Sequence, residues 1–243
     1  MKLFDDDMQA GQAGNFGFSG VRPDKLGSSE YTLVTYIGDK TGSLEGFEAL
    51  LLEAKKAAIA ACQRSPRAEF LLVRNIEFNT SVDEVHGFAQ LSTIDVSQYQ
   101  APRCYGQTAL YDATFNGVAA TNEYAKTLSE QEFAVNGIVF VSTDGCESRG
   151  ASTHTVKSIR DEIRRGVQNE WLESLMVVLI GVNAAQYKAE LEAFASDAGL
   201  TQYVDAGDAT PETLAKVAKF VSASISSQSQ ALGTGGASQP LNF

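Results

Sequence analysis

The chain has 243 residues, of which 44% are hydrophobic and 20% are charged. This composition is typical of one large globular domain or two small ones, and it excludes a fibrous or fully disordered protein. The 19 basic and 30 acidic side chains give a formal net charge of −11. Nucleic acids and anionic membranes attract proteins through Lys and Arg, so this balance argues against both as partners.

The start of the chain and its cysteines favour a cytoplasmic protein. Residues 1–4 are followed by three aspartates instead of the unbroken apolar core of a secretory signal. The longest apolar run, residues 175–182, is far shorter than the roughly 20 residues that span a bilayer. Cys62, Cys104 and Cys146 have no metal-ligand spacing, which indicates free thiols in a reducing compartment. We therefore expect a soluble, cytoplasmic protein.

Both ends of the chain are poor in apolar side chains. Residues 1–27 contain five glycines among polar residues, and residues 225–243 consist mainly of Ser, Gln, Ala, Gly and Thr. Such segments bury too little apolar surface to fold alone, so we expect a flexible N-terminal arm and a flexible C-terminal tail. The folded domain is expected to comprise residues 28–224.

Between these ends, the apolar pattern alternates between the two-residue period of strands and the 3.6-residue period of helices. This alternation is typical of an α/β fold in which helices cover a largely parallel sheet. Thr210 and Pro211 are a typical N-cap and first position of a helix. In chain order, we predict a strand at 31–37, a helix at 44–62, a strand at 70–78, a short strand or hairpin at 85–94, a helix at 108–128, a strand at 137–142, a helix at 155–168, a strand at 175–181 and helices at 184–198 and 211–224.

Oxygen-bearing side chains gather where predicted strands lead into helices. Asp39, Thr41 and Ser43 follow the first strand. Thr108 opens the second predicted helix, and Asp144 follows the strand after that helix. In an open parallel sheet these positions meet at the carboxyl edge, where such proteins bind ligands. Carboxylate and hydroxyl oxygens are the ligands that Mg²⁺ prefers, so the sequence predicts a hard-cation site there.

These residues resemble the metal-ion-dependent adhesion site (MIDAS) of von Willebrand factor type A (vWA) domains. The family pattern is Asp-x-Ser-x-Ser after the first strand, then a Thr about 70 residues later and an Asp about 100 residues later, usually within Thr-Asp-Gly. Asp39, Thr108 and Asp144 stand at these spacings. The resemblance covers residues 31–221. One departure is Thr41, where the family has Ser, which keeps the hydroxyl and adds a methyl group.

The resemblance implies a Rossmann-like vWA fold with a mostly parallel central sheet, one short antiparallel edge strand and helices on both faces. It also implies that Ser43, Thr41 and Thr108 offer hydroxyls to Mg²⁺, with Mn²⁺ and Ca²⁺ as alternatives. Asp39 and Asp144 would bind this cation directly or through water. An Asp or Glu of a protein partner would then fill the open coordination position, which describes a binding module and not an enzyme.

The family also suggests what the partner is. Intracellular stand-alone vWA proteins resemble this chain more than adhesive ones do, and many act as adaptors for AAA+ ATPases of the MoxR type or as assembly factors. By this resemblance, we expect an intracellular adaptor or assembly factor, with a AAA+ ATPase as one candidate partner.

Two alternative functions remain open. Residues 39–44, Asp-Lys-Thr-Gly-Ser-Leu, also resemble the phosphorylation motif of P-type ATPases, in which the Asp is a nucleophile. The chain would then be a haloacid-dehalogenase-like phosphotransferase acting through Asp39, although soluble relatives carry a second Asp where this chain has Thr41. In the other alternative, the terminal arms mediate assembly, and the acidic run at residues 5–7 supplies the acid that the metal of a neighbouring copy binds.

Other polar residues near these loops have simpler interpretations. We interpret Asp112 as an acid that stabilises the first turn of its helix through the helix dipole. Glu147 and Ser148 are either surface contacts on the metal-bearing face or members of an ordinary polar loop. His154 and the two nearby cysteines match no zinc-binding spacing.

Overall fold

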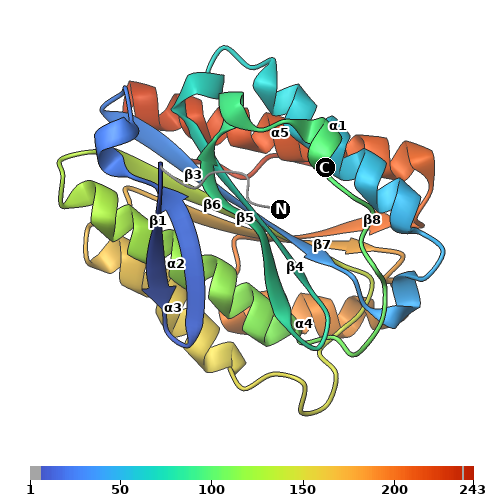
Figure 1. Ribbon diagram of the computed structural model, residues 1–243. Coiled ribbons are helices and arrows are strands. Elements are labelled where there is room, and N and C mark those ends of the chain that lie inside the picture. Colours follow the sequence, from blue (N-terminus) through green and yellow to red (C-terminus); the bar gives the residue numbers. More distant parts are fainter. Residues whose placement is uncertain (1–6, 237) are drawn as a thin grey trace.

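The computed structural model describes residues 7–236 and 238–243, so the Asp5 and Asp6 of the acidic run lie outside the described residues. Within these residues, eight strands form one sheet, and five α-helices pack against it (Figure 1). In chain order the strands and α-helices are β1 (Met8–Ala13), β2 (Phe16–Val21), β3 (Glu30–Asp39), α1 (Glu48–Gln63), β4 (Leu71–Phe78), β5 (Val82–Gln90), α2 (Leu110–Ser129), β6 (Ala134–Thr143), α3 (Val156–Gln168), β7 (Leu175–Val182), α4 (Lys188–Ala198), β8 (Gln202–Gly207) and α5 (Pro211–Thr234).

The central strands are hydrophobic along most of their length because helices cover both faces of the sheet. Helices α1 and α5 lie on one face, and α2, α3 and α4 lie on the other (Figure 1). Successive residues of β6 show the two-sided burial: Phe140 faces the first helix layer, whereas Val139 and Val141 face the second. The sheet is therefore the middle of three layers, with a core on each side.

The strand order is β1-β2-β5-β4-β3-β6-β7-β8. Strands β4, β3, β6, β7 and β8 pair in parallel, which confirms the predicted α/β class with a largely parallel sheet. Strand β5 covers part of the short strand or hairpin predicted at residues 85–94, and it is antiparallel to β4. Its other side pairs with β2 through Gly20 and Phe88. The short antiparallel strand at the edge of the sheet is β1, which pairs with β2. Strand β8 was not predicted.

The N-terminal segment is folded, so the expectation of a flexible arm over residues 1–27 was wrong for the hairpin of β1 and β2. Gly14 adopts a positive φ of 58° at the turn. Phe18 packs edge-on against Phe88 and Tyr124, and the Tyr124 hydroxyl donates a hydrogen bond to the Val21 carbonyl. The hairpin has few apolar side chains. These side chains pack against apolar residues of α2 and β5, which is why the hairpin folds despite its composition.

The C-terminal segment continues the last helix, so the expectation of a flexible tail over residues 225–243 was wrong for residues 225–234. Helix α5 continues ten residues beyond the predicted end at Ser224. Ile225 is buried, and the Gln228 side chain donates a hydrogen bond to the Gly137 carbonyl over 3.2 Å. Further on, the Leu241 carbonyl accepts a hydrogen bond from the Gln202 side chain over 3.0 Å. In the parts of the chain that the structure describes, no helix has both the length and the apolar character needed to cross a membrane.

Candidate metal centre

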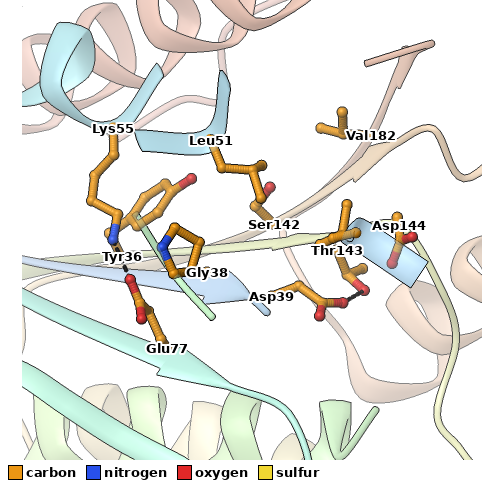
Figure 2. A pocket seen from close by; sticks show the side chains of 12 residues that line it. Tyr36, Gly38, Asp39, Leu51, Lys55, Glu77, Ser142, Thr143, Asp144 and Val182 are labelled. Atoms are coloured by element: carbon orange, nitrogen blue, oxygen red, sulfur yellow. Dashed lines mark hydrogen bonds and ion pairs between the residues drawn. The ribbon is translucent and has the colours of Figure 1, made fainter. Parts of the chain in front are cut away.

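Strands β3 and β6 lie side by side and end together at the carboxyl edge of the sheet. Their parallel register pairs Gly38 with Ser142, which places Asp39 beside Thr143. Asp144 follows directly after the end of β6. Both aspartates line one pocket at this edge (Figure 2). The fold therefore brings together two acids that are far apart in the sequence.

Asp39 is only 5% exposed, and both of its carboxylate oxygens accept hydrogen bonds. Oδ1 accepts from the Thr41 backbone N–H over 2.7 Å, and Oδ2 accepts from the Thr143 hydroxyl over 2.6 Å. Burial raises the pKa of Asp39 to about 6, the hydrogen bonds from Thr143 and Thr41 oppose this shift, and the charge of Asp144 adds to it. Folding therefore holds this carboxylate in surroundings that disfavour its charge.

Asp144 is 4% exposed and joins the same network. The Ser43 hydroxyl donates a hydrogen bond to Asp144 Oδ1 over 2.9 Å, and the Ser43 and Thr41 hydroxyls lie 3.2 Å apart. Burial raises the pKa of Asp144, while the hydrogen bond from Ser43 lowers it. Four of the five predicted site residues, Asp39, Thr41, Ser43 and Asp144, are thus connected by hydrogen bonds.

Thr108 reaches the same edge on the loop that precedes α2. Upstream in this loop, the Tyr105 N–H donates to the Lys40 carbonyl over 3.0 Å. The Thr108 N–H donates to the Ser148 hydroxyl over 3.0 Å, and the Ser148 N–H donates back to the Thr108 carbonyl over 2.9 Å. Among the described residues, the Thr108 hydroxyl makes no hydrogen bond to the other four site residues. The structure therefore places the backbone of Thr108 between the loops of Asp39 and Asp144, without a direct side-chain link.

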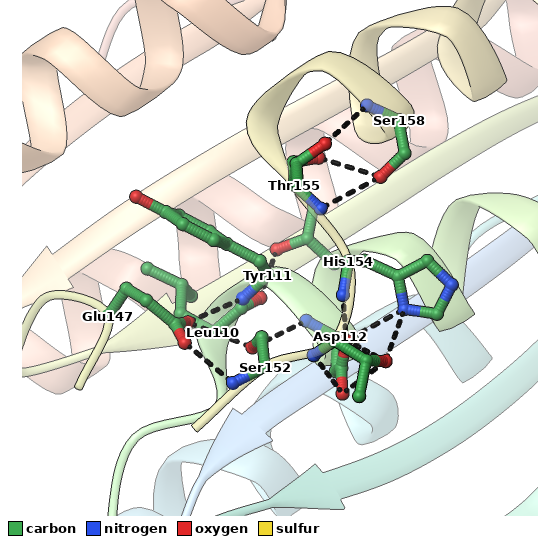
Figure 3. Close-up of polar contacts among 10 residues, drawn as sticks. Leu110, Tyr111, Asp112, Glu147, Ser152, His154, Thr155 and Ser158 are labelled. Carbon is green, nitrogen blue, oxygen red and sulfur yellow. Dashed lines mark hydrogen bonds and ion pairs between the residues drawn. The ribbon is translucent and has the colours of Figure 1, made fainter. Parts of the chain in front are cut away.

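A second polar cluster fixes the loop that follows Asp144 (Figure 3). Glu147 accepts hydrogen bonds from the Tyr111 N–H and from both the N–H and the hydroxyl of Ser152. Asp112 accepts from the His154 N–H over 2.8 Å, and His154 Nδ1 lies 2.7 Å from the same carboxylate oxygen. Glu147 and Asp112 therefore hold the loop against the start of α2, so Asp112 does more than stabilise its own helix.

Thr143 was the important residue that the sequence did not reveal. Its hydroxyl links Asp39 to the loop of Asp144, because it also accepts a hydrogen bond from the Gly145 N–H over 3.2 Å. The predicted strand end at Ser142 placed it outside the sheet. The order of β3 and β6 in the sheet, together with their register, was the missing information.

The residues present fit a hard divalent cation. Neither Asp39 nor Asp144 forms an ion pair with a Lys or Arg among the described residues, since Lys40 pairs with Asp83 and Lys55 with Glu77. Two buried carboxylates without a cationic partner are costly unless a positive charge reaches them. The surrounding donors are oxygens, as Mg²⁺, Mn²⁺ and Ca²⁺ prefer.

The same donor set disfavours a soft metal. Over residues 7–236 and 238–243, no three His, Cys, Asp or Glu side chains are arranged to hold a metal ion. The nearby Cys104, Cys146 and His154 consequently do not form a zinc-type cluster. A cation at this edge would be bound by the two carboxylates, and hydroxyl oxygens would have to serve as its remaining protein ligands.

Solved structures share this fold at low sequence identity. The pilus adhesin SpaC from Lactobacillus rhamnosus GG matches 92% of this chain with 13% identity and a TM-score of 0.57. The PilB minor pilin from Streptococcus sanguinis matches 89% of it with 15% identity and a TM-score of 0.55. The proximal thread matrix protein 1 from the mussel byssus matches 83% with 14% identity and a TM-score of 0.52. At these identities the likeness concerns the fold alone.

The chain is shorter than the proteins it resembles. It spans 36% of the SpaC chain, 66% of the PilB chain and 47% of the byssus protein chain. No protein-family model and no curated protein matches the sequence.

Proposed function

We propose that this chain is a vWA-like binding module that holds a divalent cation, Mg²⁺ in the first place, and binds an acidic side chain of a partner protein through it. The observation that carries this proposal is the pair of buried carboxylates, Asp39 and Asp144, which have hydroxyl and N–H partners but no cationic partner within residues 7–236 and 238–243. They lie at the carboxyl edge of a parallel sheet, where α/β proteins bind their ligands.

The roles of the residues follow from their chemistry. The hydroxyls of Thr41, Ser43 and Thr108 would hold the cation together with the carboxylates of Asp39 and Asp144. The cation would supply a positive charge in a partly dry site, where its attraction for a further carboxylate is stronger than in water. Two carboxylates do not fill the octahedral coordination of Mg²⁺, so a carboxylate from a partner protein could take an open position. An acidic protein could in this way recognise an acidic ligand.

A pilus adhesin among the structures with this fold supports a binding role. The phosphotransferase alternative has less support, because both Asp39 oxygens are engaged and the carboxylate is 5% exposed, which restricts its use as a nucleophile. In the alternative of assembly through the terminal segments, the segments would act as folded elements, since residues 8–13 and 16–21 form strands and residues 225–234 belong to α5. A role as an intracellular adaptor of a AAA+ ATPase stays a prediction.

Calorimetric titration of the metal-free chain with Mg²⁺ tests the proposal. We expect binding by the wild type and loss of binding in Asp39→Asn and Asp144→Asn, because each removes one carboxylate while keeping the shape of the side chain. Asp83→Asn is the matched control: Asp83 is an exposed acid that pairs with Lys40 beside the site. Unchanged Mg²⁺ affinity in both site variants would contradict the proposal. Hydrolysis of p-nitrophenyl phosphate that depends on Asp39 would favour the phosphotransferase instead.

A further inference from the structure

The surface around the candidate metal centre carries exposed side chains of the kinds that dominate protein interfaces. Tyr105 is 60% exposed, and large apolar side chains with such exposure are rare in the described parts of the chain. Arg103 lies on the same loop, and Arg149 lies on the loop that follows Asp144; both are exposed. Tyr and Arg are enriched among the residues that contribute most to protein–protein binding.

Tyr105 lies directly against the metal-binding loop. Its N–H donates to the Lys40 carbonyl over 3.0 Å. A Cβ atom added at Gly42 would come within 3.9 Å of the Tyr105 Cα. Gly42 stands between Thr41 and Ser43, two of the proposed ligands. A partner that reaches the metal would therefore pass close to Tyr105.

Arg103 also lies next to the site. The preceding residue, Pro102, lines the same pocket as Asp39 and Asp144. The following residue is Cys104. Burial raises the pKa of its thiol to about 11, and the charges of several acids, Asp39 and Asp144 among them, add to this shift. The Arg103 backbone thus lies between Pro102, which lines the pocket of Asp39 and Asp144, and Cys104, on which the charges of these two acids act.

Arg149 is placed by the pairing of Ser148 with Thr108. Two hydrogen bonds of 2.9 and 3.0 Å join these two residues, and Arg149 is the next residue in the chain. Neither Arg149 nor Arg103 forms an ion pair with any described residue, whereas the ion-paired arginines of the chain lie elsewhere. Two unpaired positive charges therefore lie beside the metal-site loops.

The charges around the site would not repel an acidic ligand once a cation is bound, although the whole chain has a formal net charge of −11. A bound divalent cation would neutralise Asp39 and Asp144, which leaves the charges around them to decide the sign. Glu48 accepts a hydrogen bond from the Gly46 N–H over 2.9 Å, and Glu45 is exposed near the same loop. The two arginines offset these two acids, and their planar guanidinium groups pair with carboxylates in a two-point geometry.

We propose that Arg103, Tyr105 and Arg149 form a second contact area for an acidic segment of a different protein. One carboxylate of the segment binds the metal, and a neighbouring carboxylate pairs with an arginine while the segment packs on Tyr105. This inference rests on the proposed function. It adds that the partner presents several acidic residues close together. The gain in affinity from a second carboxylate should become smaller as the salt concentration rises, because the charges involved are exposed.

Two synthetic peptides test this proposal on the full chain in saturating Mg²⁺: acetyl-Gly-Gly-Asp-Gly-Gly-amide and acetyl-Asp-Gly-Asp-Gly-Asp-amide. We expect the double variant Arg103→Gln/Arg149→Gln to bind the peptide with several Asp residues about tenfold more weakly than the wild type, because two exposed ion pairs are lost. Its affinity for the peptide with a single Asp is expected to be almost unchanged. Tyr105→Ser is expected to weaken both peptides to a similar degree, because it removes uncharged contact area.

The matched control is Arg64→Gln/Arg164→Gln, which removes the same charge from exposed arginines elsewhere. Arg64 follows the end of α1, whereas the metal-site loop leads into its start, and Arg164 lies on α3. This control should bind both peptides like the wild type. Thermal unfolding of each variant checks that the fold is intact.

The outcomes separate the two proposals. If neither peptide binds in an Mg²⁺-dependent way, the proposed function itself fails. If both bind with Mg²⁺ but the double variant Arg103→Gln/Arg149→Gln binds the peptide with several Asp residues like the wild type, the second contact area is wrong. An Mg²⁺-dependent dimer of the chain that the same double variant abolishes would assign this surface to a second copy and would also overturn the proposal.

Discussion

Two acids near the carboxyl edge of the sheet have opposite electrostatic surroundings. Asp112 accepts hydrogen bonds from the backbone N–H groups of Thr153 and His154 and from the His154 side chain. Burial alone would raise the pKa of Asp112, but the hydrogen bonds from His154 and Thr153 outweigh it and lower the pKa. Asp39 receives one N–H and one hydroxyl, and its pKa is raised to about 6.

The difference lies in how completely the protein itself satisfies each carboxylate. Asp112 is stabilised as an anion by the protein alone, so its role is structural: it ties the loop after Asp144 to α2. Asp39 is buried beside a second carboxylate, and the protein supplies too little positive potential to compensate. A bound cation would supply the compensation that Asp39 lacks, and it would change little at Asp112.

The largest expected effect is that the charge of Asp39 lowers the free energy of unfolding of the metal-free protein. Because the folded pKa of about 6 lies above the ordinary value of 3.8, the folded state is penalised once Asp39 ionises. Asp39→Asn should therefore be more stable than the wild type in EDTA, by about 3 kcal/mol at pH 8. The advantage should appear as the pH rises from about 4 to above 6. Urea unfolding at pH 4.5, 6 and 8 measures it.

Saturating Mg²⁺ sharpens the same comparison. The cation should stabilise the wild type and leave Asp39→Asn unaffected, so the order of their stabilities should approach equality or reverse at pH 8. Asp83→Asn, which removes an exposed acid beside the site, serves as the control for a change in net charge. An Asp39→Asn variant that is less stable than the wild type in EDTA at pH 8 would show that the protein already compensates Asp39.

The opposite sign is expected for Asp112. Asp112→Asn should lower the free energy of unfolding by about 2 kcal/mol at pH 7, with or without Mg²⁺, because hydrogen bonds to a charged acceptor are lost. Since the folded pKa of Asp112 is lowered, its stabilisation is present above the ordinary value of 3.8 and is lost as the pH falls below it. Urea unfolding of this variant and the wild type between pH 3 and 7 measures the effect. A destabilisation that Mg²⁺ abolishes would mean that Asp112 belongs to the metal site.

The sequence predicts the parts of the fold that depend on local pattern. Strands β6 and β7 contain apolar runs, and β3 is rich in β-branched and aromatic residues. Helix α5 begins at the expected Pro211, and the side chain of its N-cap Thr210 accepts a hydrogen bond from the Thr213 N–H. The hairpin of β1 and β2 and the extension of α5 depend on distant partners, such as Tyr124 for Val21 and Gly137 for Gln228. Composition therefore describes what a segment can bury by itself, but not the surface that the rest of the chain offers it.

The residues of the candidate site also fall into those that local sequence pattern predicts and those that depend on distant partners. Asp39, Thr41, Ser43 and Asp144 could be found because the carboxyl ends of parallel strands converge, and the structure joins these four by hydrogen bonds. Their role as metal ligands stays a prediction. Thr143 could not be found without the order and register of the strands, because its part is to contact Asp39 across two neighbouring strands.

The smallest expected effect concerns the Thr143 hydroxyl. Its hydrogen bond to Asp39 partly stabilises the charge of this carboxylate, which has no cationic partner among the described residues. Thr143→Val keeps the shape of the side chain and removes the hydrogen bond to Asp39 Oδ2, so the pKa of Asp39 should rise further and the metal-free protein should lose about 1 kcal/mol at pH 8. Mg²⁺ affinity, measured by calorimetry, should fall about tenfold, since the bond also orients a proposed ligand. Thr114→Val is the matched control, because this buried hydroxyl donates to the Leu110 carbonyl within α2 over 2.8 Å. Equal Mg²⁺ affinities in the two variants would mean that the orientation of Asp39 does not depend on Thr143, and that its environment is closer to the self-sufficient one of Asp112.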